Sequence, residues 1–104
     1  MIKVKYKKKE YITNINISGH ALYDDYGKDI VCASVSSVVI NTMNIISIID
    51  ASIVDIEKRN GYVNIIVKNY NELVDKILLN LIFEMNELMN NYKKYIRVEE
   101  DSHE

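Results

Sequence analysis

The stretch GHALYDDYGKDIVCASVS, residues 19–36, is where the sequence pattern changes and where the fold is decided. Before it, apolar and polar residues alternate over residues 2–7 and again over residues 11–17, which predicts two strands joined by a turn. After it, apolar residues recur at helical spacing, which predicts a helix over residues 30–50. Residues 19–28 carry two of the three glycines and show no apolar period, so we predict a loop there.

The second half of the chain shows the same succession of patterns. Asn60-Gly61 suits the positive φ of a tight hairpin turn, and Asn69 or Asn71 is a candidate cap for a following helix. The predicted elements are strands at residues 52–58, 62–68 and 95–99 and a helix at residues 74–92. The order strand-strand-helix-strand-strand-helix-strand predicts an α+β fold, in which both helices pack on a mixed or antiparallel sheet.

Length and composition fit one globular domain over residues 1–104. A formal net charge of −2 gives no strong field, so direct nucleic-acid binding is not expected. One cysteine cannot form an intramolecular disulfide, and the N-terminal residues lack the apolar core of a signal peptide. We expect no membrane-spanning segment, because no apolar stretch approaches the required length. These features favour a cytoplasmic protein.

The second predicted helix carries more apolar residues than one buried face needs. Leu79, Ile82 and Phe83 widen its apolar stripe. A helix that is apolar over much of its girth often packs against a second subunit. A homodimer and a deeply buried helix of a monomer both fit this pattern.

The only cysteine of the chain lies close to one of its two histidines. If Asp29 caps the first helix, Cys32 lies in its first turn, where unpaired backbone amides and the helix dipole favour a thiolate. Helical spacing puts Asp29, Cys32 and Ser36 on one side, while Val35 faces the core. His20, on the preceding loop, could take the proton of the Cys32 thiol as a general base. These residues form a candidate site of a cysteine hydrolase.

Other readings of the same residues stay open at this point. A single cysteine on an amphipathic helix is often a small buried hydrophobe. One cysteine and one histidine fall short of a zinc site, so no metal is expected. A redox sensor would need an oxidisable exposed thiol, but the chain has no second cysteine to resolve it. Tyr23 and Tyr26 are either ordinary loop aromatics or contacts for an aromatic side chain of a substrate.

The same segment resembles the signature of the ribosomal-processing cysteine protease family (Prp) of Firmicutes and relatives. The residues that carry the resemblance are Gly19-His20-Ala21, Gly27, Asp29-Ile30-Val31-Cys32-Ala33 and Val35-Ser36. The spacing of the histidine and cysteine blocks, the chain length and the order of elements are similar to those of the family.

The resemblance implies roles for these residues. Cys32 would be the nucleophile and His20 its base, with Asp29, Ser36 and Gly19 in support. The substrate loop would be mobile, would order over the substrate and would be hinged at its two glycines. Its implied members are Ala21, Tyr23, Tyr26 and Gly27.

The resemblance also implies a substrate. The family consists of small cytoplasmic cysteine endopeptidases, usually homodimers, that need no cofactor. They remove the N-terminal extension of protein twenty-seven of the large ribosomal subunit, cutting after an aromatic residue and before an alanine. The alternative is a non-catalytic ribosome-associated or protein-binding module of the same fold, for which Cys32 would be buried and replaceable by alanine.

Overall fold

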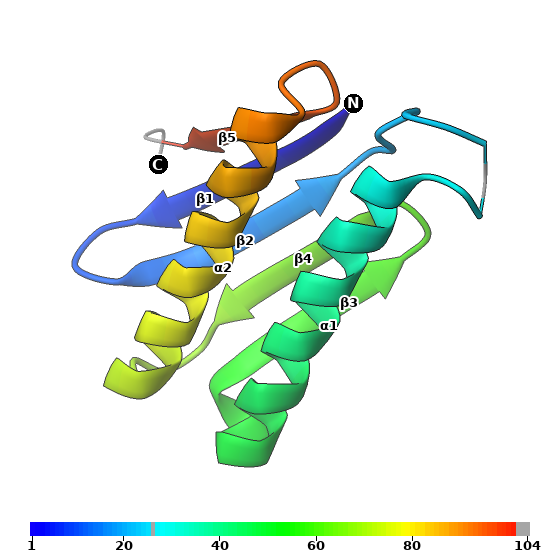
Figure 1. Ribbon diagram of the computed structural model, residues 1–104. Helices are drawn as coiled ribbons and strands as arrows, with labels where there is room; N and C mark the ends of the chain where they lie inside the picture. The colour runs from blue at the N-terminus through cyan, green and yellow to red at the C-terminus, as the bar shows by residue number, and fades with distance from the viewer. Residues whose placement is uncertain (26, 102–104) are drawn as a thin grey trace.

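The computed structural model of the chain describes residues 1–25 and 27–101 (Figure 1). Its helices and strands follow one another in the predicted order, and the α+β fold is confirmed. The elements are β1 (Ile2–Lys8), β2 (Ile12–Ser18), α1 (Ile30–Asp50), the short 3-10 helix η1 (Ala51–Ile53), β3 (Val54–Arg59), β4 (Tyr62–Val67), α2 (Glu72–Asn91) and β5 (Ile96–Glu100).

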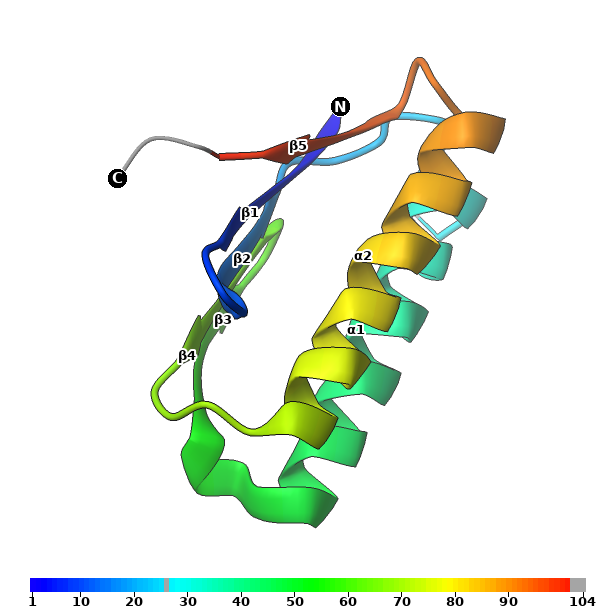
Figure 2. The ribbon, with the colours of Figure 1, turned by 90° about the vertical axis from the view of Figure 1, so that its left-hand side faces the viewer.

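The strands form one mixed sheet in the order β3-β4-β2-β1-β5. β5 runs parallel to β1, and the other neighbouring strands are antiparallel. Both helices cover the same face of the sheet (Figure 2). The register pairs Ser18 at the end of β2 with Tyr62 at the start of β4. The loop that follows β2 and the turn between β3 and β4 therefore lie at the same end of the sheet.

Side-chain caps explain where the helices and their flanking turns begin. The Asn71 side chain accepts a hydrogen bond from the Val74 amide at 2.9 Å, so Asn71, rather than Asn69, caps α2. The Asp50 carboxylate accepts from the Ser52 amide at 2.9 Å and holds η1 after α1. Because of this turn, β3 begins at Val54, two residues later than the sequence pattern predicts.

The core lies between the helices and the sheet. It is lined by Val31, Val35, Val39 and Ile46 of α1, by Val74, Leu78, Leu81, Ile82 and Met85 of α2, and by Ile15, Ile17 and Ile65 of the sheet. Ile82 therefore belongs to the buried face of α2. Of the three residues that widen the apolar stripe, only Leu79 and Phe83 are exposed, by 38% and 59%.

The outer face of α1 is uncharged and mixes apolar with polar side chains. Ile40, Ile45 and Ile48 are exposed there, and α1 contains no charged residue before Asp50. By length and composition alone, residues 30–53 could cross a membrane. The expectation that no segment approaches that length was therefore wrong. A helix that packs one apolar face in a core can have the same length and composition. α1 packs in this way through Val31, Val35, Val39 and Ile46.

Candidate active site

Asp29 fixes the start of α1 and the position of Cys32. Its Oδ1 accepts hydrogen bonds from the amides of Val31 and Cys32, each at 3.0 Å. The N-cap prediction for Asp29 is confirmed. Cys32 consequently lies in the first turn of α1, where the helix dipole favours an anionic sulfur.

The second carboxylate oxygen of Asp29 holds the loop. Asp29 Oδ2 accepts a hydrogen bond from the Tyr23 amide at 3.0 Å. Burial tends to raise the pKa of Asp29, but hydrogen bonds from Cys32, Tyr23 and Val31 outweigh it and hold the pKa below its ordinary value. Asp29 is therefore a charged group at neutral pH that ties the loop to the first turn of the helix.

The thiol of Cys32 contacts the loop at the residue beside His20. Cys32 is half-buried, and its Sγ accepts a hydrogen bond from the Ala21 amide at 3.3 Å. Ala21 itself is buried, with 3% of its surface exposed. The thiol is thus not the fully buried hydrophobe that a non-catalytic fold predicts, and the loop brings the neighbour of His20 to it.

His20 lies against the turn between β3 and β4. The Gly19 amide donates a hydrogen bond to the Gly61 carbonyl at 2.9 Å, which joins the start of the loop to this turn. The imidazole of His20 packs on the open side of Gly61. Three separate segments therefore meet at the site: the loop after β2, the first turn of α1 and the β3–β4 turn.

These segments enclose a cavity of about 920 Å³. This volume is in the upper part of the range of ligand pockets, roughly 300–1,000 Å³. Six of the residues singled out in the sequence line it: Gly19, His20, Gly27, Asp29, Cys32 and Ser36. Tyr26 was also predicted to belong to the site, and it lies outside the described residues.

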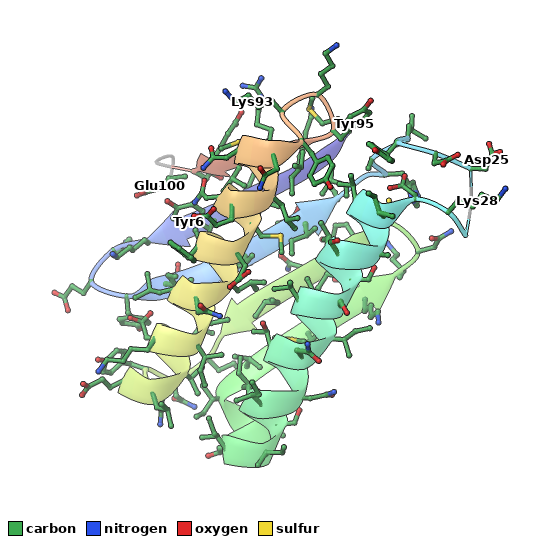
Figure 3. All side chains as sticks on the ribbon, viewed as in Figure 1. Tyr6, Asp25, Lys28, Lys93, Tyr95 and Glu100 are labelled. Carbon is green, nitrogen blue, oxygen red and sulfur yellow. The ribbon has the colours of Figure 1, made fainter. Side chains whose placement is uncertain are left out.

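Tyr23 does not line the cavity in the described part of the chain, and its ring packs within the protein. Its ring packs edge-on against Tyr92 and Tyr95, with centroid distances of 5.7 and 5.0 Å. Figure 3 shows Tyr95 after the end of α2, whereas Asp25 and Lys28 lie at the outer end of the loop. Tyr23 therefore anchors the loop to the end of α2.

Sequence reasoning missed one wall of the cavity. This wall consists of Lys58, Arg59, Asn60, Gly61 and Tyr62, and Leu22 of the loop and Ile40 of α1 are further lining residues. The Arg59 guanidinium lies 4.0 Å from the centroid of the Tyr62 ring and pairs with the Glu57 carboxylate. Leu22 is 78% exposed and has a φ of 58°. The signal that could have found this wall is the Asn60-Gly61 turn, once β4 is paired with β2.

The site has the composition of a cysteine hydrolase. The Cys32 thiol, at the N-terminus of α1, and the His20 imidazole line the same cavity. Asp29 holds the loop between them through its hydrogen bond from the Tyr23 amide. In the described part of the chain, no cluster of three or more metal-ligating side chains is present.

Comparison with known proteins agrees with this class. The family model of the cysteine protease Prp matches residues 1–97, so the chain belongs to this family and the resemblance is confirmed. A search of curated proteins found no match.

Solved structures share the fold over nearly the whole chain. The essential ribosomal processing protease Prp from S. aureus, in complex with a covalently linked product peptide, is 29% identical and has a TM-score of 0.89. That match covers 97% of this chain and 100% of the other. The same protease with a substrate peptide gives 25% identity and a TM-score of 0.85, at 97% and 100% coverage. SMU.848 from Streptococcus mutans, at 23% identity and a TM-score of 0.77, covers 96% and 93% and shares the fold.

Proposed function

We propose that this protein is a cysteine endopeptidase that removes the N-terminal extension of protein twenty-seven of the large ribosomal subunit. Cys32 is the nucleophile and His20 the base, and the cut follows an aromatic residue and precedes an alanine. The observation that carries the proposal is the 3.3 Å contact of the Cys32 sulfur with the Ala21 amide, which brings His20 and the thiol to one cavity. The S. aureus protease, which has a similar fold, is known with a substrate peptide and a covalently linked product peptide.

The proposed reaction is acyl transfer in two steps. His20 takes the proton of the Cys32 thiol, and the thiolate attacks the carbonyl carbon of the residue before the cut. The C–N bond breaks, the amine leaves with the proton from His20, and a thioester remains on Cys32. Water, deprotonated by His20, then attacks the thioester, which releases a carboxylate and restores the thiol.

The surroundings of the thiol support this chemistry. The Ala21 amide donates a hydrogen bond to the Cys32 sulfur, where negative charge develops, and the first turn of α1 places that sulfur where the helix dipole favours an anion. Ser36 lines the same cavity one helical turn further along α1. The charged Asp29 carboxylate joins the loop to the first turn of α1 through its hydrogen bonds.

The test is mass spectrometry of the ribosomal protein with its extension after incubation with the wild-type protein, Cys32→Ala or Ser37→Ala. Ser37 is exposed on the same helix. We expect one cut after an aromatic residue with the wild type and Ser37→Ala, and none with Cys32→Ala. If all three leave the substrate intact while folded and reduced, the protein is a non-catalytic ribosome-associated or protein-binding module.

Two further properties belong to this proposal. We propose a homodimer, because Leu79 and Phe83 leave apolar surface on α2 that a second copy could cover. We also propose that the reaction takes place in the cytoplasm, where a single thiol stays reduced.

A further inference from the structure

Gly61 makes an unusually close approach to His20. It occupies the turn between β3 and β4 with a φ of +69°, a conformation that favours glycine. Arg59 and Tyr62 pair across this two-residue turn. The missing side chain of Gly61 leaves space, and the His20 ring occupies it.

With the His20 ring in its present position, the contact leaves no room for a Cβ at position 61. A Cβ on Gly61 would lie 2.6 Å from Nε2 and 3.1 Å from Cε1 of His20, whereas ordinary contacts begin at 3.4 Å. The nearest atom is the far end of a side chain, so the ring could turn away without moving the backbone. A methyl group at this position would therefore displace the imidazole while leaving the fold in place.

The backbone on both sides of the contact is fixed. The Gly19 amide donates to the Gly61 carbonyl at 2.9 Å, and Ser18 pairs with Tyr62 in the sheet. The Cα of His20 cannot easily follow a displaced ring, because its neighbour Gly19 is held by this hydrogen bond. Displacement would fall on the side-chain torsions of His20.

We propose that Gly61 is a positioning residue for the reaction, because its lack of a side chain sets where the His20 imidazole rests in the cavity that Cys32 also lines. This inference rests on the proposed function of His20 as the base. It assigns the β3–β4 turn, distant in sequence from the histidine and cysteine, a part in the geometry of the site. Misplacement of a catalytic group by about 1 Å can cost on the order of 100-fold in rate.

The chain offers a matched control in Gly27. It has a φ of +87° and lines the same cavity, but a Cβ there would meet nothing within 4 Å. Gly27→Ala therefore introduces the backbone strain of a positive φ without touching His20. Because Gly27 belongs to the implied substrate loop, Gly27→Ala serves as the control for backbone strain in the folding and NMR measurements, and Ser37→Ala serves as the control for activity.

The first experiment measures the rate of Cys32 alkylation by iodoacetamide against pH in the wild type, Gly61→Ala, His20→Ala and Ser37→Ala, whose residue is exposed on α1 and does not line the cavity. The other charged groups around the cavity, Asp24, Asp29, Lys58 and Arg59, are the same in all four. We expect Gly61→Ala to shift the pH profile toward that of His20→Ala, and Ser37→Ala to follow the wild type. A wild-type profile in folded Gly61→Ala overturns the proposal.

A second readout separates this inference from the proposed function. NMR signals of the His20 ring protons should shift in Gly61→Ala and stay in place in Gly27→Ala. Unshifted ring signals in Gly61→Ala overturn the positioning role. If the ring signals shift but His20→Ala leaves both alkylation and peptide cleavage unchanged, His20 is not the base, and both proposals are overturned.

Peptide cleavage gives the size of the effect. We expect Gly61→Ala to lower kcat/KM by about 100-fold and Ser37→Ala to keep the wild-type value. The melting temperatures of Gly61→Ala and Gly27→Ala should be similar, since both place alanine at a positive φ. An unchanged kcat/KM in folded Gly61→Ala would overturn the positioning role.

Discussion

Asp29 uses both of its carboxylate oxygens, one on the first turn of α1 and one on the loop. Asp29→Ala removes three hydrogen bonds, and the loss of a helix N-cap alone costs about 1 kcal/mol. We expect the free energy of unfolding to fall by at least that amount in urea titrations. Asp29→Asn keeps an acceptor for the helix amides and should lose less. Equal losses in the two variants would show that the tie to Tyr23 dominates.

The charge of Asp29 makes part of this stability dependent on pH. Its pKa is lowered in the folded state, because the hydrogen bonds it accepts outweigh its burial. A lowered pKa contributes stability at pH values above the unfolded value, about 3.9, and the contribution is lost as pH falls through the folded value. The difference in melting temperature between the wild type and Asp29→Ala should therefore be largest near pH 7 and shrink toward pH 3. A melting-temperature difference that stays constant from pH 7 to pH 3 would contradict the lowered pKa of Asp29.

Gly19 differs from Gly61 in what surrounds it. A Cβ on Gly19 would run into the backbone carbonyl of Met1, and its φ is +94°. A backbone atom directly before β1 cannot turn away as the tip of an imidazole can. We expect Gly19→Ala to lower the free energy of unfolding by more than about 2 kcal/mol, measured in urea, with Gly27→Ala as the strained but uncrowded control. Equal losses of unfolding free energy in the two variants would show that the positive φ, and not the contact with Met1, sets the cost.

At the scale of elements, the sequence pattern predicted those helices, strands and caps that depend on interactions between residues close together in the chain. The alternation in β1 and β2, the apolar period of α1 and the Asp29 cap were readable because each depends on residues a few positions apart. The 3-10 helix η1 was missed, because residues 52–58 look like one continuous strand. In the structure the Asp50 carboxylate accepts from the Ser52 amide and holds the first of these residues in a turn. In the Asn60-Gly61 turn, Gly61 has a positive φ and Asn60 does not.

The candidate site was predicted only in part, for a related reason. His20, Asp29 and Cys32 lie within one segment, so their proximity follows from sequence. The Lys58–Tyr62 wall comes to the cavity through the pairing of β2 with β4, a contact between residues more than forty positions apart in the chain. No periodicity within either segment specifies that register.

The loop after β2 is anchored by an aromatic contact that can be tested. Tyr23 packs on Tyr92 and Tyr95, while its amide is held by Asp29. Tyr23→Ala should raise the hydrogen-exchange rates of residues 19–25 and change those of the sheet little. Tyr70→Ala is the control, because it removes a ring contact with Tyr11 at the other end of β2. Equal protection in the wild type and Tyr23→Ala would show that the hydrogen bonds alone hold the loop.

At the scale of the whole molecule, the two helices lie on the same side of the sheet (Figure 2). Both leave apolar side chains exposed, among them Leu79 and Phe83 on α2 and Ile48, which is 85% exposed, on α1. Patches of this kind in a small domain often pack against another subunit. The two helices offer alternative surfaces for the proposed homodimer, and one of them must supply most of its buried area.

We expect α2 to supply it, because Phe83 is the larger side chain and Leu79 lies one helical turn before it. The wild type should sediment as a dimer, and Phe83→Glu should sediment as a monomer, since a buried unpaired carboxylate in an apolar interface costs several kcal/mol, roughly 2–5. Ile48→Glu is the matched change on α1 and should leave the dimer intact. A dimer that is lost only in Ile48→Glu would place the interface on α1 instead, and a monomeric wild type at all concentrations would remove the dimer from the proposal. Because the candidate active site lies at the N-terminal end of α1, either interface can be separated from catalysis by measuring peptide cleavage in the same variants.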